Sequence, residues 1–141
     1  MKILIEIPTW LGDSIMLTPA FENIISNFND PEISIIGSQI SVEILKNHPK
    51  VVKHYILAKK YAFLIKQARN FESFDIFISF RRSFRSIVLK KFVDAKTKYQ
   101  FNSNKYKNRH VVEQYNNFVR DIFEIDKSPG NLKIYQNVNT I

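Results

Sequence analysis

The stretch Lys2–Pro8, KILIEIP, is typical of a short buried β-strand, and stretches of the same kind recur along the chain. Branched apolar residues dominate it, and a proline ends it, as expected for a strand that leads into a turn. A second strong run is Phe74–Phe80, FDIFISF. Three weaker runs complete the predicted set of strands: Ile33–Gly37, Val52–Leu57 and Thr97–Phe101.

Helical patterns fill the intervals between these runs. Apolar residues recur at steps of three and four within 20–28, 84–92 and 111–122, and shorter patterns cover 42–45 and 61–70. Strand and helix therefore alternate about five times, which favours stacked βαβ units. The sequence predicts an α/β fold: a three-layer, Rossmann-like domain with a mainly parallel sheet.

The length and composition fit one domain with a substantial core. The chain has 141 residues, of which 45% are hydrophobic, and no cysteine. General disorder, disulfides and thiolate chemistry are thereby excluded. No run of about eighteen apolar residues occurs, and the first strand is not a secretory signal peptide. We expect residues 1–130 to form the domain and 131–141, after the break at Pro129-Gly130, to be an edge strand or the start of an interdomain linker.

The positive charge is concentrated in one segment. The net charge is +8, and the segment from Arg81 to Arg109 holds ten basic residues against one acidic residue, Asp94. That segment carries +9, so the remainder sums to −1. Such an imbalance indicates an anionic partner, namely nucleic acid, a phosphorylated ligand or an acidic membrane surface. The alternative is a solvated basic face without a partner.

The turn after the first strand supplies one set of candidate site residues. In open α/β sheets, ligands bind beyond the carboxyl ends of the strands. Here that end reads Pro8-Thr9-Trp10-Leu11-Gly12-Asp13-Ser14. Gly12 fits a tight turn. Trp10 either packs or covers a sugar ring.

Asp13 has two interpretations. It caps a preliminary helical turn, with the main helix starting at Pro19 behind a Thr18 cap, or it points into the crevice as a general base.

The turn after the fourth strand supplies the second set. Arg81, Arg82, Ser83 and Arg85 follow the FDIFIS strand, so we expect them at the same edge as Asp13. Ser83 is the predicted cap of the next helix. The arginine forks suit phosphate or carboxylate groups. The alternative is a set of surface arginines that pair with nearby acids.

Several common sites are disfavoured. The chain has three glycines and neither GxGxxG nor GxxxxGK[ST], which argues against NAD, FAD and P-loop nucleotide binding. Its three histidines are well separated and lack metal-ligand spacing. We therefore predict no metal site and no bound cofactor.

Three stretches resemble one enzyme family in order and spacing. PTWLGDSIMLTPAFENI after the opening strand, then FDIFISFRRSFRSIVLKKFVDAKTKYQF, then RHVVEQYNNF are similar to segments of the ADP-heptose:lipopolysaccharide heptosyltransferases, glycosyltransferase family nine, most of all the heptosyltransferase II type. The resemblance covers most of the chain. It corresponds to the N-terminal half of a GT-B enzyme, in which two Rossmann-like domains face a cleft.

This resemblance implies an inverting transfer of heptose from ADP-heptose to the inner core of lipopolysaccharide. The family's proposed base falls on Asp13, with Trp10 and Gly12 beside it. Ser83 and Arg85, and with them Arg81 and Arg82, would hold anionic groups of the acceptor, Kdo-lipid A with or without a first heptose. ADP-heptose is the implied donor, bound mainly by a C-terminal half. The implied location is cytoplasmic, at the anionic inner face of the inner membrane, and this chain alone is expected to be inactive.

Two alternatives remain beside this prediction. One is a non-catalytic basic α/β module that binds nucleic acid or another anionic polymer, although no recognised nucleic-acid motif supports it. The other is a two-domain glycosyltransferase that acts on a different glycan.

Overall fold

A five-stranded parallel sheet forms the centre of the computed structural model, which describes residues 1–107, 109–124, 129–133 and 135. The strand order is β3-β2-β1-β4-β5, and every neighbouring pair is parallel. The strands are β1 (Lys2–Glu6), β2 (Glu32–Gly37), β3 (Val51–Ile56), β4 (Phe74–Ser79) and β5 (Ala95–Gln100). The predicted strands and their parallel arrangement are confirmed.

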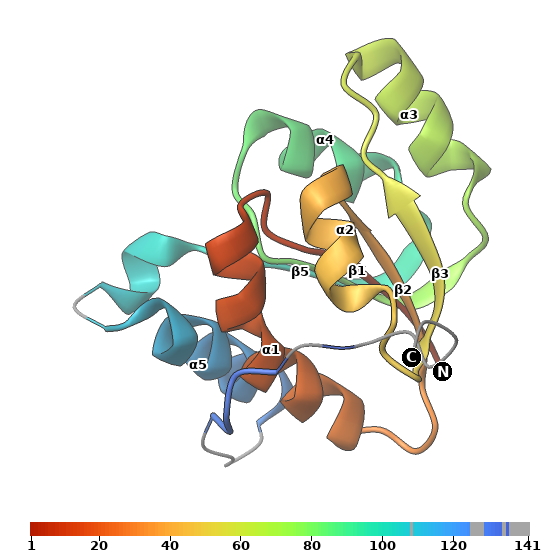
Figure 1. Cartoon of the computed structure of the whole chain (residues 1–141). Helices are drawn as coiled ribbons and strands as arrows, with labels where there is room; N and C mark the ends of the chain where they lie inside the picture. Colours follow the sequence, from red (N-terminus) through yellow and green to blue (C-terminus); the bar gives the residue numbers. More distant parts are fainter. Residues whose placement is uncertain (108, 125–128, 134, 136–141) are drawn as a thin grey trace.

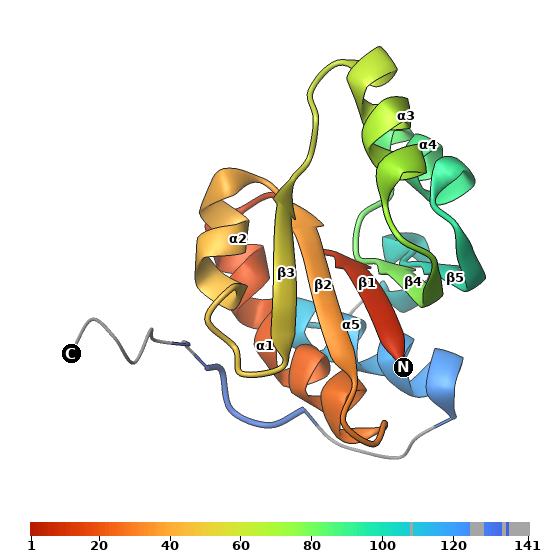
Figure 2. The ribbon, with the colours of Figure 1, turned by 90° about the vertical axis from the view of Figure 1, so that its right-hand side faces the viewer.

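Helices cover both faces of the sheet (Figures 1 and 2). One layer contains α1 (Leu11–Ser26), α2 (Gln39–Leu45) and α5 (Val111–Phe123). The other contains α3 (Tyr61–Asn70) and α4 (Phe84–Phe92), which pack against each other. A short 3₁₀ helix, η1 (Ser103–Tyr106), leads from β5 towards α5. The predicted three-layer α/β architecture is therefore confirmed.

The central strand β1 is buried on both faces. Ile3 and Ile5 pack in the core beneath α1, α2 and α5, whereas Leu4 packs in the core beneath α3 and α4. All three side chains have no exposed surface. A strand covered on both sides reads as a nearly continuous apolar run rather than an alternating one, which accounts for the sequence KILIEIP.

The start of α1 differs from the prediction. The helix begins at Leu11 with Trp10 as its N-cap, so Asp13 lies within the first turn and caps nothing, and Thr18 and Pro19 lie inside the helix. Pro19 offers no N–H to the carbonyl four residues earlier. That carbonyl, of Ile15, instead accepts a hydrogen bond from the Thr18 hydroxyl at 2.7 Å. The hydroxyl thus compensates for the proline, and the helix continues through it.

The segment 131–141, predicted as an edge strand or linker start, lies largely outside the described residues. Two of its described residues contact α1. The Lys133 amide donates to the Thr18 hydroxyl at 2.9 Å, and the Tyr135 hydroxyl donates to the Glu22 carboxylate at 2.7 Å. These contacts attach the chain after Pro129-Gly130 to the outer surface of α1.

Candidate functional site

The carboxyl ends of β1 and β4 mark the point where the strand order reverses. To one side of β1 lie β2 and β3, and to the other lie β4 and β5. The Phe80 amide donates to the Glu6 carbonyl at 2.9 Å, so the turn after β4 begins directly beside the end of β1. In open α/β sheets this reversal point is where ligands bind. The two candidate turns therefore leave the same edge of the sheet, as the sequence predicted.

A cavity of about 410 Å³ opens at this edge. The turns after β1, β2, β3 and β4 all contribute to it. Its lining consists of Thr9, Ser38, Gln39, Ile40, Ile56, Leu57, Ala58, Lys59, Arg81 and Arg85. Three of these side chains are cationic and none is acidic, so the cavity suits an anionic ligand of the size of one or two sugar rings.

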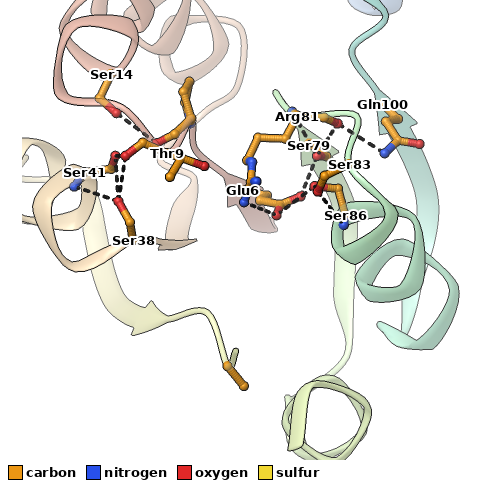
Figure 3. Close-up of polar contacts among 12 residues, drawn as sticks. Glu6, Thr9, Ser14, Ser38, Ser41, Ser79, Arg81, Ser83, Ser86 and Gln100 are labelled. Carbon is orange, nitrogen blue, oxygen red and sulfur yellow. Dashed lines mark hydrogen bonds and ion pairs between the residues drawn. The ribbon is translucent and has the colours of Figure 1, made fainter. Parts of the chain in front are cut away.

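Hydroxyl groups fix one wall of this cavity (Figure 3). The Thr9 carbonyl accepts hydrogen bonds from the hydroxyls of Ser38 and Ser41, both at 2.8 Å. Ser38 also caps α2, since its side chain accepts from the Ser41 amide at 3.3 Å. The Thr9 hydroxyl itself is buried and, within the described part of the chain, has no hydrogen-bond partner. This hydroxyl therefore keeps an unused donor and an unused acceptor at the wall of the cavity.

A fully buried carboxylate, Glu6, lies behind Arg81 (Figure 3). It accepts hydrogen bonds from the hydroxyls of Ser79 at 2.6 Å and Ser86 at 3.1 Å. One of its oxygens lies 3.7 Å from the Arg81 guanidinium. Burial raises the pKa of Glu6, and the two hydroxyls and the charge of Arg81 oppose that rise.

Glu6 had no role in the sequence interpretation. The available signal was a carboxylate inside an otherwise apolar strand, since Glu is almost never buried without partners.

The backbone of Arg81 is held from two sides. Its backbone carbonyl accepts a hydrogen bond from the side-chain amide of Gln100 at 3.1 Å. The same carbonyl lies 3.0 Å from the Ser79 hydroxyl. A serine hydroxyl has one proton, so Ser79 directs it to either Glu6 or this carbonyl. The network therefore connects the protonation of Glu6 to the residue that lines the cavity.

The remaining residues of the basic turn occupy different positions. Ser83 caps α4, accepting from the Ser86 amide at 3.2 Å, as predicted. Arg85 lines the cavity, and its guanidinium lies 5.6 Å from the centre of the Tyr61 ring. Arg82 is exposed and does not line the cavity. The pairing of surface arginines with nearby acids holds for Arg81 alone among the three, within the described residues.

Of the turn after β1, only Thr9 lines the cavity, and the candidates Trp10, Gly12 and Asp13 lie outside the lining. Asp13 lies in the first turn of α1, outside the lining, and among the described residues its carboxylate makes no hydrogen bond or ion pair. It lies near Tyr115, whose pKa is raised first by burial and then by the charge of Asp13.

Two expectations for this turn were wrong. Trp10 does not pack, because 74% of it is exposed. Gly12 has no left-handed conformation, since it belongs to the helix. A Cβ at Gly12 would meet no atom within 4 Å, so this position leaves open space above the helix start.

Among the described residues, no group of three or more His, Asp or Glu side chains gathers in a way that could hold a metal ion. No helix in that part of the chain has the length and apolarity needed to cross a bilayer.

The fold is that of glycosyltransferase family 9 structures, although no family model matches the sequence. A family 9 glycosyl transferase from Veillonella parvula superposes with a TM-score of 0.77 at 19% identity, over 94% of this chain and 44% of that one. The ADP-heptose LPS heptosyltransferase II of E. coli gives a TM-score of 0.73 at 16% identity, over 99% of this chain and 48% of that one.

The sequence relatives are more specific. The chain is similar in sequence to heptosyltransferases: it is 31% identical over 137 residues to lipooligosaccharide heptosyltransferase 2 of Campylobacter jejuni, and 28% identical to the same enzyme of a second strain. These alignments cover 95% of this chain, but 42% and 43% of the relatives. The chain thus spans less than half the length of the curated relatives it matches.

Proposed function

We propose that this chain is the N-terminal, acceptor-binding part of an inverting heptosyltransferase, which moves heptose from ADP-heptose to the inner core of lipopolysaccharide. The observation that carries the proposal is the 31% identity to a lipooligosaccharide heptosyltransferase over almost the whole chain. A related structure, the E. coli heptosyltransferase WaaC, contains ADP-2-deoxy-2-fluoro heptose, which supports ADP-heptose as the donor.

The cavity at the sheet edge supplies the acceptor site of this proposal. Lys59, Arg81 and Arg85 converge on it, and guanidinium groups match carboxylates and phosphates in shape. Thr9 adds an unpartnered hydroxyl for a sugar. Inner-core acceptors combine these two features, because Kdo is a carboxylated sugar and is linked to phosphorylated lipid A. Ser83 and Arg82 would contribute from the rim of the same turn.

Asp13 is the proposed base of the reaction. Its carboxylate would take the proton of an acceptor hydroxyl while the hydroxyl oxygen attacks the anomeric carbon of heptose. The bond from that carbon to ADP breaks as the new bond forms on the opposite face, and ADP leaves with the electron pair. Asp13 suits this role because, among the described residues, its carboxylate has no protein partner and lies in the helix turn that follows the cavity-lining Thr9. Exposed Trp10 and the open space at Gly12 leave room for a sugar ring there.

The donor would be bound mainly by a further half of the enzyme, and this chain alone would show no transfer. The proposed location is the cytoplasmic face of the inner membrane, where a lipid-anchored acceptor is available.

Acceptor binding is the test of the proposal on this chain. Titration with the deacylated Kdo-lipid A head group should give saturable binding, and Arg85→Ala should weaken it about tenfold or more, as expected for a lost charge-assisted contact. Lys105→Ala, an exposed cation outside the cavity, is the matched control. Absence of saturable binding, together with tight and salt-sensitive binding of DNA or RNA, would favour the nucleic-acid module instead.

A further inference from the structure

Exposed apolar side chains gather where α3 and α4 begin. Tyr61 and Phe63 lie in the first turn of α3, and Phe84 and Ile87 lie in the first turn of α4. All four are exposed, Phe63 by 60% and Phe84 by 67%. The rings of Tyr61 and Phe84 are in contact, with centroids 5.4 Å apart, so the two helix starts form one surface. We name these four residues the α3–α4 patch.

The charged residues of α3, of α4 and of the turns before them are all cations. Residues 57–70 and 80–93 contain no Asp or Glu. The basic residues of these two stretches are Lys59, Lys60, Lys66, Arg69, Arg81, Arg82, Arg85, Lys90 and Lys91. The nearest acids in sequence lie where β4 and β5 begin, at the opposite end of the layer: Glu72 and Asp75 pair with lysines, and Asp94 bonds to Ser73. The nearest acids in sequence thus lie away from the helix starts that carry the patch.

We propose that the α3–α4 patch is the surface that docks on an anionic lipid bilayer. Aromatic rings and aliphatic side chains enter the region between headgroups and acyl chains, while Lys and Arg stems extend to anionic headgroups. Apolar and basic groups occur here side by side. A nucleic-acid phosphate backbone would use the cations and leave Phe63 and Ile87 in water. The bilayer uses both kinds of group.

The position of the patch connects it to the cavity. Arg85 lines the cavity and also lies over the Tyr61 ring of the patch. An acceptor whose lipid remains in the bilayer could therefore place its charged sugar in the cavity without leaving the membrane. This link between the docking surface and the cavity rests on the proposed function. Lipid binding itself requires neither donor nor acceptor sugar.

Vesicle sedimentation tests the proposal directly. The chain should partition onto vesicles of phosphatidylethanolamine with phosphatidylglycerol and not onto pure phosphatidylcholine vesicles. The double variant Lys60→Glu/Arg82→Glu should lower that partitioning about 30-fold or more. Its matched control is Lys105→Glu/Lys107→Glu, which changes the net charge equally at exposed positions outside the patch.

The apolar contribution has its own pair of variants. Phe63→Ser/Phe84→Ser should lower partitioning about tenfold or more, since two aromatic side chains lose burial in the bilayer. Val52→Ser, at a residue that is 55% exposed on β3, should leave it unchanged. Thermal melting of each variant reports whether it folds, and the comparison of wild-type protein on the two kinds of vesicle does not depend on any variant.

Several results would overturn the proposal. Specific docking by the patch would be excluded if wild-type protein did not bind anionic vesicles. It would also be excluded if both charge-reversal variants lost vesicle partitioning equally. Release of a dimer by Phe63→Ser/Phe84→Ser would assign the patch to a second copy of the chain. RNA that displaces the protein from vesicles, with no effect of the aromatic variant, would assign the cations to nucleic acid. If the protein does not bind anionic vesicles but binds the acceptor head group saturably, the docking proposal is wrong and the proposed function is unaffected.

Discussion

The carboxylate of Glu6 and the guanidinium of Arg81 lie 3.7 Å apart where β1 and β4 end side by side. Glu6 is fully buried, whereas Arg81 reaches the cavity. Removing one partner of a buried ion pair is costly because the other charge stays behind without compensation. The cation that faces a ligand thus depends on an anion that no ligand can reach.

The buried position of Glu6 predicts an unusual pH dependence of stability. Its pKa in the folded chain is raised above the ordinary value of 4.5, so the folded state holds the proton more tightly than the unfolded state. The stabilisation is fully present below the unfolded pKa and is lost as pH rises through the folded pKa. Urea unfolding at a series of pH values should show the free energy of unfolding of wild type falling relative to Glu6→Gln from about pH 4.5 upward. A free energy of unfolding of wild type that rises relative to that of Glu6→Gln over this pH range would contradict the prediction.

The hydroxyls that bind Glu6 should contribute measurably to stability. Ser79→Ala or Ser86→Ala removes a hydrogen bond from a buried carboxylate, which should cost about 1–3 kcal/mol. Ser103→Ala, at an exposed residue of η1, is the control and should change the free energy of unfolding by less than about 0.5 kcal/mol. Chemical denaturation measures both, and equal effects at the three positions would argue against the Glu6 network.

Two glycines should respond oppositely to alanine. A Cβ on Gly37 would lie 2.6 Å from Cγ1 of Ile7, which is fully buried and has little room to move. Gly37→Ala should therefore destabilise the fold by about 1–3 kcal/mol. Gly12→Ala meets no atom and lies in a helix, so it should be neutral or stabilising by up to about 1 kcal/mol. Thermal melting of the two variants in parallel would detect the difference, and similar melting temperatures would count against it.

The catalytic role proposed for Asp13 predicts a loss of turnover without a loss of structure. In an enzyme that contains this chain and a donor-binding half, Asp13→Asn should lower kcat about 100-fold to 10,000-fold, as expected for the loss of a general base. Acceptor binding and melting temperature should stay unchanged, because the carboxylate has no partner among the described residues. Glu113→Gln, an exposed carboxylate on α5, is the control. Turnover near that of the wild type would remove Asp13 from the mechanism.

The fold was predictable because its strands are recognisable as apolar runs in the amino-acid sequence. A strand buried on both faces, such as β1, is a continuous apolar run, and the cap of α4 follows from Ser83 alone. The start of α1 was not predictable in this way. Whether Pro19 begins or interrupts a helix depends on the compensating bond from Thr18, which propensity rules omit.

The site was predictable only in part. The arginines of the turn after β4 are visible as a charged cluster, and the fold places two of them at the cavity. Lys59 follows a weak strand and has no motif, so only the convergence of four turns assigns it to the same lining. Glu6 required knowledge of Ser79 and Ser86, which lie more than seventy positions away in the chain.

The convergence of Ser38 and Ser41 on one carbonyl of Thr9 has a consequence for selectivity. These two hydroxyls, which also bond to each other, hold this wall in place, so a ligand need not order the wall when it binds. A ligand of the wrong shape cannot gain affinity by inducing this wall to close around it. Selectivity at this wall therefore depends on the shape and charge of the preorganised site.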